Sequence, residues 1–374
     1  MKFNNFIPVS EPILSKEDKK IALKEINAGN ISSFGKYNSL FENDFSKFIG
    51  CKYGLTVSNG TTALETALFG IGIKENDEII IPNFTIISCL NAVLKFKATP
   101  VFVDIDKRTW NLDTKLFERI VSKKTKAVIV CHLFGHPANM KKIMSLKKKY
   151  NFKIIEDCAE SHGAMFNNKK VGSFGDVSTF SFYSNKIITT GEGGMVMTSN
   201  KKYFEKMKGY KNLFFGKYKR FKHEQIGYNF RLTNIQAAIG YSQLKRINKI
   251  IDAKRNLGFI YQRYLSDINN VQTQIEEKWA KTVFWMYGFV ISNKKISAMK
   301  VIKELSKKNI EARPFFRSLD TQPFMKNYNF IKPYDTPVSD YLSNYGMYLP
   351  SSLNLKKSVI KNIVSEVNII INGK

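Results

Sequence analysis

The strongest constraint on the fold of this chain is an alternation of short apolar runs and amphipathic segments that begins near Leu55. The apolar runs are typical of buried strands, and the amphipathic segments are typical of helices. The predicted strands are residues 78–81, 100–104, 127–130 and 153–156, with helices at 62–70, 88–95 and 140–150. This order predicts an α/β fold with a mostly parallel sheet wrapped by helices, and ligands at the carboxyl ends of its strands.

The pattern differs toward both ends of the chain. Helical spacing at residues 15–28 and 37–48 precedes the alternating part, and residues 233–250 predict one long helix that leaves the sheet. Beyond it the sequence predicts helices at 251–265, 298–308 and 355–371 and a strand at 285–292. We therefore expect a large α/β domain over residues 1–250 and a smaller α+β domain over residues 251–374.

The charge balance bears on the choice of partners. The net charge is +28, but 50 of the 59 basic residues are Lys, and they are scattered along the chain. Arg is the side chain expected for bidentate recognition of phosphates and bases. The composition therefore argues against a nucleic-acid-binding protein and is compatible with a phosphorylated small molecule.

Signatures of several other protein classes are missing from the sequence. The four cysteines form no CxxC pair and there are only four His, so we expect neither a disulfide framework nor a metal site. No apolar run has the length of a membrane span, and the N-terminal residues do not resemble a signal peptide. We expect a cytoplasmic protein with no membrane partner.

Residues 58–62 (SNGTT) stand directly before a predicted helix. A glycine turn and two hydroxyl residues at a helix start present backbone N–H groups and side-chain donors to a phosphate. An ordinary N-cap explains the same residues without any ligand. This motif alone leaves both interpretations open.

Residues 154–163 (IIEDCAESHG) place acidic side chains at the carboxyl end of a predicted buried strand. Asp157 at that position can pair with a protonated heteroaromatic nitrogen, bind a metal or cap a helix. His132 and His136 follow the neighbouring predicted strand, and we expect a structural or site-wall role for them rather than catalysis.

Lys186 differs in setting from the other lysines, because residues 175–194 around it are rich in aromatic, hydroxyl and glycine residues. Partial desolvation lowers the pKa of a lysine and makes it a nucleophile suited to Schiff-base chemistry. Taken singly, a lysine is usually a solvated surface residue. The case for a reactive lysine here therefore depends on the other two motifs, residues 58–62 and 154–163.

The three motifs together predict a site for pyridoxal 5'-phosphate (PLP), with the helix start for the phosphate, Asp157 for the pyridine nitrogen and Lys186 for the covalent bond. Here the sequence resembles the DegT/StrS-type sugar aminotransferases, which are PLP enzymes of fold type I. The resemblance extends from residues 32–35 (SSFG) through 227–231 (GYNFR) to 313–314 (RP). Residues 180–182 (FSF) and 185–194 (NKIITTGEGG) look most like the GDP-perosamine synthase branch, which aminates a 4-keto sugar nucleotide.

The resemblance implies a role for each matching residue. Lys186 is expected to be the Schiff-base lysine and proton shuttle, and Asp157 the partner of the pyridine nitrogen. The other implied cofactor contacts are Gly60, Thr61, Thr62, Ile86, Ala159, Glu160, Ser181 and, from the second subunit of a homodimer with shared active sites, Asn229. The candidate substrate contacts are His162, Lys219, Arg220, Arg231, Arg313 and Arg317.

Two positions depart from the family pattern. Ile86 stands where the family usually has Tyr or Phe against the cofactor ring, so aromatic stacking is lost there. After Arg313 and Pro314, Asp320 occupies about the position of a His that family members often have in the substrate region.

The resemblance implies an aminotransferase that moves an amino group from an amino acid, expected to be L-glutamate, to a keto sugar nucleotide for a surface polysaccharide. The departure at Asp320 and the positive charge keep a smaller phosphorylated ketone as an alternative acceptor. One branch of the family dehydrates its sugar and has His at the lysine position, and Lys186 argues against that activity. A non-catalytic PLP-binding regulator is the alternative from another class.

Overall fold

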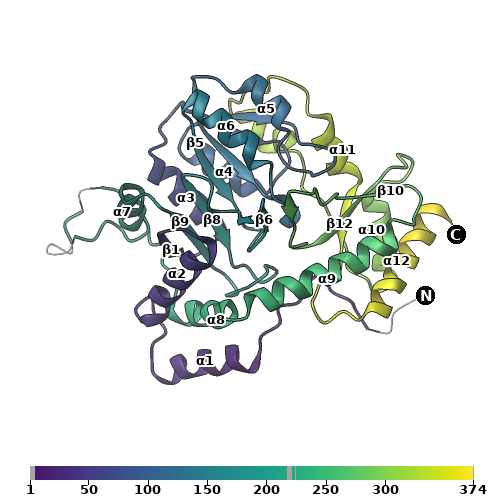
Figure 1. Ribbon diagram of the computed structural model, residues 1–374, viewed down its shortest axis with the longest axis horizontal. Helices are drawn as coiled ribbons and strands as arrows, with labels where there is room; N and C mark the ends of the chain where they lie inside the picture. The colour runs from purple at the N-terminus through teal and green to yellow at the C-terminus, as the bar shows by residue number, and fades with distance from the viewer. Residues whose placement is uncertain (1–4, 217–220, 224, 374) are drawn as a thin grey trace.

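The computed structural model describes residues 5–216, 221–223 and 225–373 (Figure 1). Its main element is a seven-stranded sheet with the strand order β1-β9-β8-β5-β4-β2-β3. The strands from β8 to β3 in this order are parallel, whereas β9 is antiparallel to both of its neighbours. The predicted α/β fold with a mostly parallel sheet is confirmed. The strands are β1 (Tyr53–Val57), β2 (Glu78–Pro82), β3 (Thr99–Val103), β4 (Thr125–Cys131), β5 (Lys153–Asp157), β8 (Val177–Ser181) and β9 (Gly194–Thr198).

Both faces of this sheet are buried, because successive residues of its strands enter two different hydrophobic clusters. In β2, Ile79 and Ile81 belong to the cluster on one face and Ile80 to the cluster on the other. The first face packs against α2 (Lys36–Ile49), α3 (Gly60–Ile71), α4 (Ile87–Lys95) and α7 (Lys201–Tyr210). The second face packs against α5 (Thr114–Ile120) and α6 (Met140–Tyr150).

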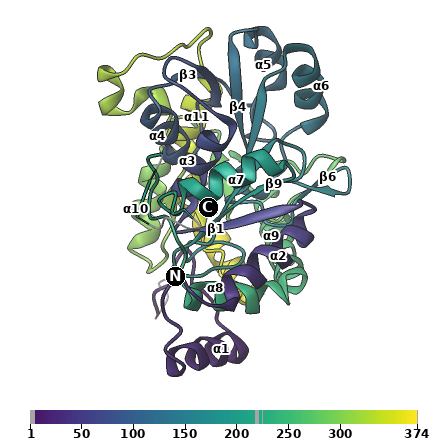
Figure 2. The same cartoon turned by 90° about the vertical axis from the view of Figure 1, so that its left-hand side faces the viewer.

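The expected long helix over residues 233–250 is wrong, because the structure has two helices there. Helix α8 (Asn234–Leu244) ends before Arg246, whose φ of −121° lies outside the helical region, and α9 (Ile247–Leu265) begins after it. The Arg246 guanidinium pairs with Asp18, a fully buried carboxylate on α1 (Lys16–Asn27). Figure 2 shows α1 and α8 together at the bottom of the molecule, away from α5 and α6 at the top.

The C-terminal part builds a second, antiparallel sheet with the order β10-β12-β14-β13 and a core of its own. The first described residues also join this part, because Ile7 forms a parallel bridge with Ile310 and is buried in the same core. The domain boundary near residue 250 stays a prediction. The elements of this part are β10 (Val271–Thr273), β12 (Tyr287–Ile291), α10 (Ala298–Ser306), β13 (Arg313–Pro314), α11 (Pro337–Tyr345), β14 (Gly346–Leu349) and α12 (Lys357–Asn372).

A small third sheet connects the two parts, since β11 (Ala280–Lys281) pairs with β6 (Met165–Phe166), which pairs in turn with β7 (Lys169–Lys170). Within the described residues, no helix has the length and apolar character that crossing a membrane requires.

Candidate active site

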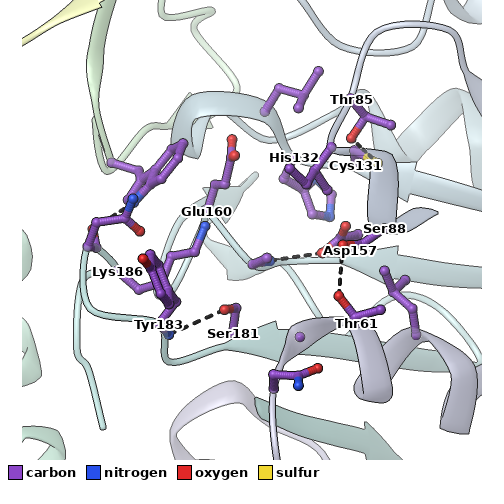
Figure 3. Close-up of a pocket in the computed structure, with 18 of the residues that line it drawn as sticks. Thr61, Thr85, Ser88, Cys131, His132, Asp157, Glu160, Ser181, Tyr183 and Lys186 are labelled. Carbon is purple, nitrogen blue, oxygen red and sulfur yellow. Dashed lines mark hydrogen bonds between the residues drawn. The ribbon is translucent and has the colours of Figure 1, made fainter. Parts of the chain in front are cut away.

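A cavity of about 460 Å³ opens at the carboxyl ends of the parallel strands (Figure 3). Cys131, Asp157 and Ser181 end the strands β4, β5 and β8, and all three line this cavity. Thr85 follows β2, and Thr61 lies in the first turn of α3. The motifs that are separated in the sequence therefore meet where a sheet of this kind binds ligands.

The start of α3 forms one wall of the cavity. Asn59 is the N-cap: its Oδ1 accepts from the Thr62 N–H at 2.9 Å, and the Thr62 hydroxyl donates to the Asn59 carbonyl at 2.9 Å. The backbone N–H groups of Gly60 and Thr61 have no acceptor inside the helix, because the first turn lacks one. An ordinary cap and an anion site therefore coexist here: Asn59 and Thr62 make the cap, and Gly60 and Thr61 line the cavity.

Gly60 is required by a close approach of two backbone segments. A Cβ atom at this position would lie 2.9 Å from the Cβ of Ser181 at the end of β8. On the other side, the Thr61 hydroxyl lies 2.8 Å from the hydroxyl of Ser88. These contacts place backbone donors and hydroxyl groups together at one end of the cavity.

Asp157 is almost completely buried at the cavity floor. Its Oδ1 accepts a hydrogen bond from the Ala159 N–H at 3.1 Å, and its Oδ2 accepts one from the Cys89 thiol at 3.2 Å. A carboxylate has about four acceptor positions, so this one can accept a further donor from the cavity.

Lys186 lies across the cavity from Asp157 and points toward Glu160 (Figure 3). Its Nζ is 4.0 Å from the ring centroid of Trp285, and the Trp285 indole N–H donates to the Asn185 carbonyl at 2.8 Å. Burial lowers the pKa of the Lys186 amine, although the charges of Glu160 and Asp157 oppose this effect. The amine is therefore closer to its neutral, nucleophilic form than a solvated lysine is.

Glu160 is affected by burial in the opposite sense. Burial raises the pKa of its carboxyl to about 7, while the charge of Lys186 and a hydrogen bond from the Phe134 N–H at 2.8 Å partly oppose the shift. The carboxyl group beside Lys186 therefore keeps its proton to a higher pH than a solvated glutamate does.

His132 forms part of the cavity wall, as the sequence predicted. Its Nδ1 accepts from the Ala138 N–H at 2.9 Å, so its Nε2 donates the proton to Glu156 at 3.1 Å. Burial opposes ionisation of Glu156, but the hydrogen bonds from His132 and from the backbone of Gly172 and Gly175 keep its pKa below the ordinary value. Both side chains are thus occupied in structural contacts.

Most of the predicted cofactor contacts come together at the cavity. The predicted residues that line it are Gly60, Thr61, Ile86, Asp157, Ala159, Glu160, Ser181 and Lys186. The predicted residues that do not line it are Thr62, His162, Asn229, Arg231, Arg313 and Arg317. Lys219 and Arg220 lie outside the described residues.

The expectation that His162 contacts cofactor or substrate is not met. Its side chain is fully buried, and its ring packs among Phe45, Phe180 and Phe182 with centroid distances of 6.1, 5.5 and 5.5 Å. This apolar surrounding lowers the pKa of His162 to about 3. Aromatic packing behind the site explains this residue better than a ligand contact.

The predicted substrate arginines have other partners within the chain. The Arg313 guanidinium is exposed and donates to Glu311 at 2.8 and 2.9 Å. Arg231 donates to the Asn212 side chain at 2.8 Å. Arg317 is exposed and lies 3.4 Å from the Thr321 hydroxyl. Their roles toward a substrate stay predictions.

Three aromatic residues that the sequence did not single out close the cavity on the side of Lys186. Trp285, Phe316 and Tyr348 all come from the C-terminal part of the chain. The Phe134 ring contacts all three, with centroid distances of 6.1, 6.0 and 6.2 Å to Trp285, Phe316 and Tyr348. No local motif marks these residues, since only the fold brings them to the cavity.

Comparison with known proteins agrees with this geometry. The sequence model of the DegT/DnrJ/EryC1/StrS aminotransferase family matches residues 12–368. The chain belongs to this family. It is therefore a PLP-dependent aminotransferase, as the sequence motifs predicted.

Two relatives match this chain over nearly their full length. GDP-perosamine synthase of Escherichia coli O157:H7 is 38% identical over 97% of this chain and 98% of its own length. GDP-perosamine synthase of Vibrio cholerae is 37% identical over 96% and 97%. Among solved structures, the aminotransferase PseC of Helicobacter pylori superimposes with a TM-score of 0.92 at 28% identity, over 99% of this chain and 100% of that one.

The residues of the cavity fit PLP. The N–H groups at the start of α3 suit its phosphate, the Asp157 carboxylate suits a protonated pyridine nitrogen, and the Lys186 amine suits its aldehyde carbon. The close approach of Gly60 and Ser181 leaves no room for a side chain at Gly60, so the backbone stays accessible to an anion.

Proposed function

We propose that this aminotransferase moves an amino group from L-glutamate to a keto sugar nucleotide such as GDP-4-keto-6-deoxymannose, for the synthesis of a surface polysaccharide. The observation that supports this proposal most strongly is the nearly full-length similarity to GDP-perosamine synthases of two organisms, together with a lysine at position 186 in the cavity.

Different residues of the cavity have different roles in the proposed transfer. PLP, when bound, acts as an electron sink for negative charge that develops on the carbon beside the amine. Asp157 would hold PLP at its pyridine nitrogen and keep a proton there, because a buried carboxylate stabilises a cation beside it. Lys186 Nζ would accept the proton from the α-carbon of the amino donor and would later give one to the acceptor carbon. Trp285, Phe316 and Tyr348 would shield the Lys186 side of the cavity from water.

The structure gives no support to a smaller phosphorylated ketone as the acceptor. That alternative rested on Asp320, which does not line the cavity, and on the positive charge, which suits a sugar nucleotide equally well. The Asn83 amide donates to Asp320 Oδ1 at 2.7 Å, and Lys332 Nζ lies 2.5 Å from Oδ2. Asp320 therefore stabilises the junction of the two parts of the chain. The regulator alternative has no supporting feature either.

We also propose that the protein is a homodimer in which Asn229 completes the cavity of the partner subunit. Asn229 is exposed and does not line the cavity of its own chain. A backbone bridge to Asn212 fixes its position beside the end of α7. Apolar side chains are exposed both near Asn229 and at the cavity, with exposed fractions of 80% for Ile226 and 46% for Tyr183. An apolar surface of this kind is typical of a subunit contact.

A labelled transfer assay tests the acceptor and the donor together. The protein with PLP is incubated with 15N-labelled L-glutamate and GDP-4-keto-6-deoxymannose, and mass spectrometry follows the nucleotide sugar. We expect 15N in the nucleotide sugar and an equal amount of 2-oxoglutarate. Parallel reactions contain UDP-linked keto sugars or dihydroxyacetone phosphate. Preferential labelling of the triose phosphate, or no labelling of any sugar nucleotide, would refute the proposal.

A further inference from the structure

Next to Asp157 lies a buried group of side chains that the implied cofactor roles do not include; two of them, Thr85 and Cys131, also line the cavity. The thiol of Cys89, on α4, lies 3.2 Å from Asp157 Oδ2 and 3.7 Å from the thiol of Cys131, at the end of β4. The hydroxyl of Thr85 lies 3.2 Å from the Cys131 sulfur. All four side chains are nearly or completely shielded from solvent.

Hydrogen counting fixes the direction of this chain of contacts. A thiol has one hydrogen to donate. An ionised carboxylate only accepts, so the Cys89 hydrogen goes to Asp157 Oδ2. Cys131 must then be the donor toward the Cys89 sulfur, and Thr85 donates to the Cys131 sulfur. The hydrogen bonds run in one direction from Thr85 through Cys131 and Cys89 to the carboxylate.

We propose that Cys89 is a positioning residue for the aminotransferase reaction, because its S–H hydrogen bond holds the Asp157 carboxylate in the orientation that the pyridine nitrogen of PLP requires. The Ala159 N–H fixes Oδ1 from one side, and the Cys89 thiol fixes Oδ2 from the other. Two donors on different oxygens prevent rotation of the carboxylate and leave its remaining acceptor positions directed to the cavity.

The chemical state of Cys89 suits this role. Its pKa is well above the ordinary value, because of the hydrogen bond with Cys131, burial and the charge of Asp157. Cys89 therefore stays a neutral thiol and keeps the hydrogen that it donates. A thiolate at this place would repel the carboxylate instead of holding it.

Three variants test this proposal in the holoenzyme. Cys89→Ala removes the donor, Cys89→Ser keeps a donor of similar size, and Cys158→Ala is the matched control. Cys158 is also fully buried and follows Asp157 directly, but the carboxylate donors among the described residues are Cys89 and Ala159.

We expect Cys89→Ala to raise the dissociation constant for PLP and to lower kcat by about five- to tenfold each, the effect of one hydrogen bond to a charged group. KM for the amino donor stays unchanged, because Cys89 lies behind Asp157 and not in the cavity. The pH midpoint of the visible absorption band of bound PLP shifts in Cys89→Ala alone. Cys89→Ser recovers the PLP dissociation constant and kcat to within about twofold of wild type and restores the pH midpoint.

Two results would overturn the proposal. Wild-type PLP affinity and absorption in a folded Cys89→Ala protein would show that the thiol does not act on Asp157. A Cys89→Ser protein as defective as Cys89→Ala would show that packing matters and the hydrogen bond does not.

Infrared spectroscopy keeps the test valid even if Cys89→Ala does not fold. The S–H stretching band that disappears in Cys89→Ser belongs to Cys89, and in wild type it should lie at the low frequency of a hydrogen-bonded thiol. In Asp157→Asn this band should move to higher frequency, because a neutral amide oxygen is a weaker acceptor than a carboxylate. An unchanged band would count against the proposal.

Discussion

At the scale of single residues, burial acts on Lys186 and Glu160 in the same sense, because it favours the neutral form of each. The pKa of the amine is lowered and that of the carboxyl is raised, although each charge partly stabilises the other. Each group therefore reaches its neutral form more easily than it does in water. Such a pair is suited to a reaction in which a lysine takes up and releases protons.

Lys186→Ala should abolish amine transfer and leave the fold intact, because the amine is the proposed nucleophile and base while its side chain caps no element. Transfer of 15N from glutamate measures activity, and circular dichroism measures the fold. Lys186→Arg should be equally inactive, because a guanidinium does not lose its proton. Transfer above background in either variant would remove Lys186 from the mechanism.

Glu160→Gln should make the cofactor-free protein more stable at neutral and alkaline pH. The folded-state pKa of Glu160, about 7, lies above the ordinary 4.5, so the wild-type protein loses stability as the pH rises from 4.5 through 7. The variant lacks this loss, and the difference should grow to roughly 3 kcal/mol above pH 7 and vanish below pH 4.5.

Urea unfolding at a series of pH values measures this difference in the free energy of unfolding. Gln keeps an oxygen to accept from the Phe134 N–H, so the comparison isolates the charge. Glu75→Gln, at an exposed turn, is the control. A difference that does not depend on pH would contradict the assigned environment of Glu160.

At the scale of elements, two adjacent threonines in the first turn of α3 make different contacts. The Thr62 hydroxyl is engaged in the cap with Asn59, whereas the Thr61 hydroxyl lies at the cavity beside Ser88. The cap aligns the free N–H groups, and the hydroxyl of Thr61 adds a donor to them. Stability and ligand binding are thus assigned to neighbouring residues of the same type.

Thr61→Ala and Thr62→Ala should therefore have different effects. Thr61→Ala should raise the dissociation constant for PLP about tenfold, the effect of a hydrogen bond to a charged group, and leave stability nearly unchanged. Thr62→Ala should lower the free energy of unfolding by about 1 kcal/mol, because it removes the hydroxyl's half of the capping box while the bond from the backbone N–H to Asn59 remains. Its effect on PLP should be smaller. PLP titration and urea unfolding of both proteins measure this, and identical effects of the two changes would refute the division.

The elements also show how far sequence reasoning reaches. The alternation of strands and helices predicted the parallel sheet, and the residues at the strand ends predicted the cavity, because both depend on local patterns. The break at Arg246 was missed, since apolar spacing continues through it, and the ion pair that Arg246 makes there is with the distant Asp18. The contribution of Trp285 to the cavity depends in the same way on packing between parts that are far apart in sequence.

At the scale of the whole molecule, the cavity of one chain is not lined by all of the predicted cofactor contacts. Asn229 lies outside its own cavity, whereas Lys186 and Asp157 lie inside it. Assembly of two chains would bring the missing residue to each cavity. Activity and assembly are then coupled, because a chain alone lacks a donor for the cofactor.

Mixing two inactive or weakened proteins tests this coupling. In a heterodimer of Lys186→Ala and Asn229→Ala subunits, shared sites would give one cavity with both defects and one with neither. Amine transfer should then recover to about half the wild-type value per heterodimer, the share of intact cavities. Mixtures of each variant with itself are the controls. No recovery despite proven subunit exchange would mean that Asn229 acts within its own chain.

The bridge between Ile7 and Ile310 has a consequence for synthesis of the protein. The Val9 N–H bonds to the Glu311 side chain across 302 positions of the chain. A ribosome makes the N-terminal residues first, so the partners of Ile7 and Val9 do not exist until most of the polypeptide has emerged. The parallel strands of the central sheet can pair earlier, because their partners are closer in sequence. Ile7 and Val9 are therefore synthesised long before their partners and are among the last residues to form their native contacts.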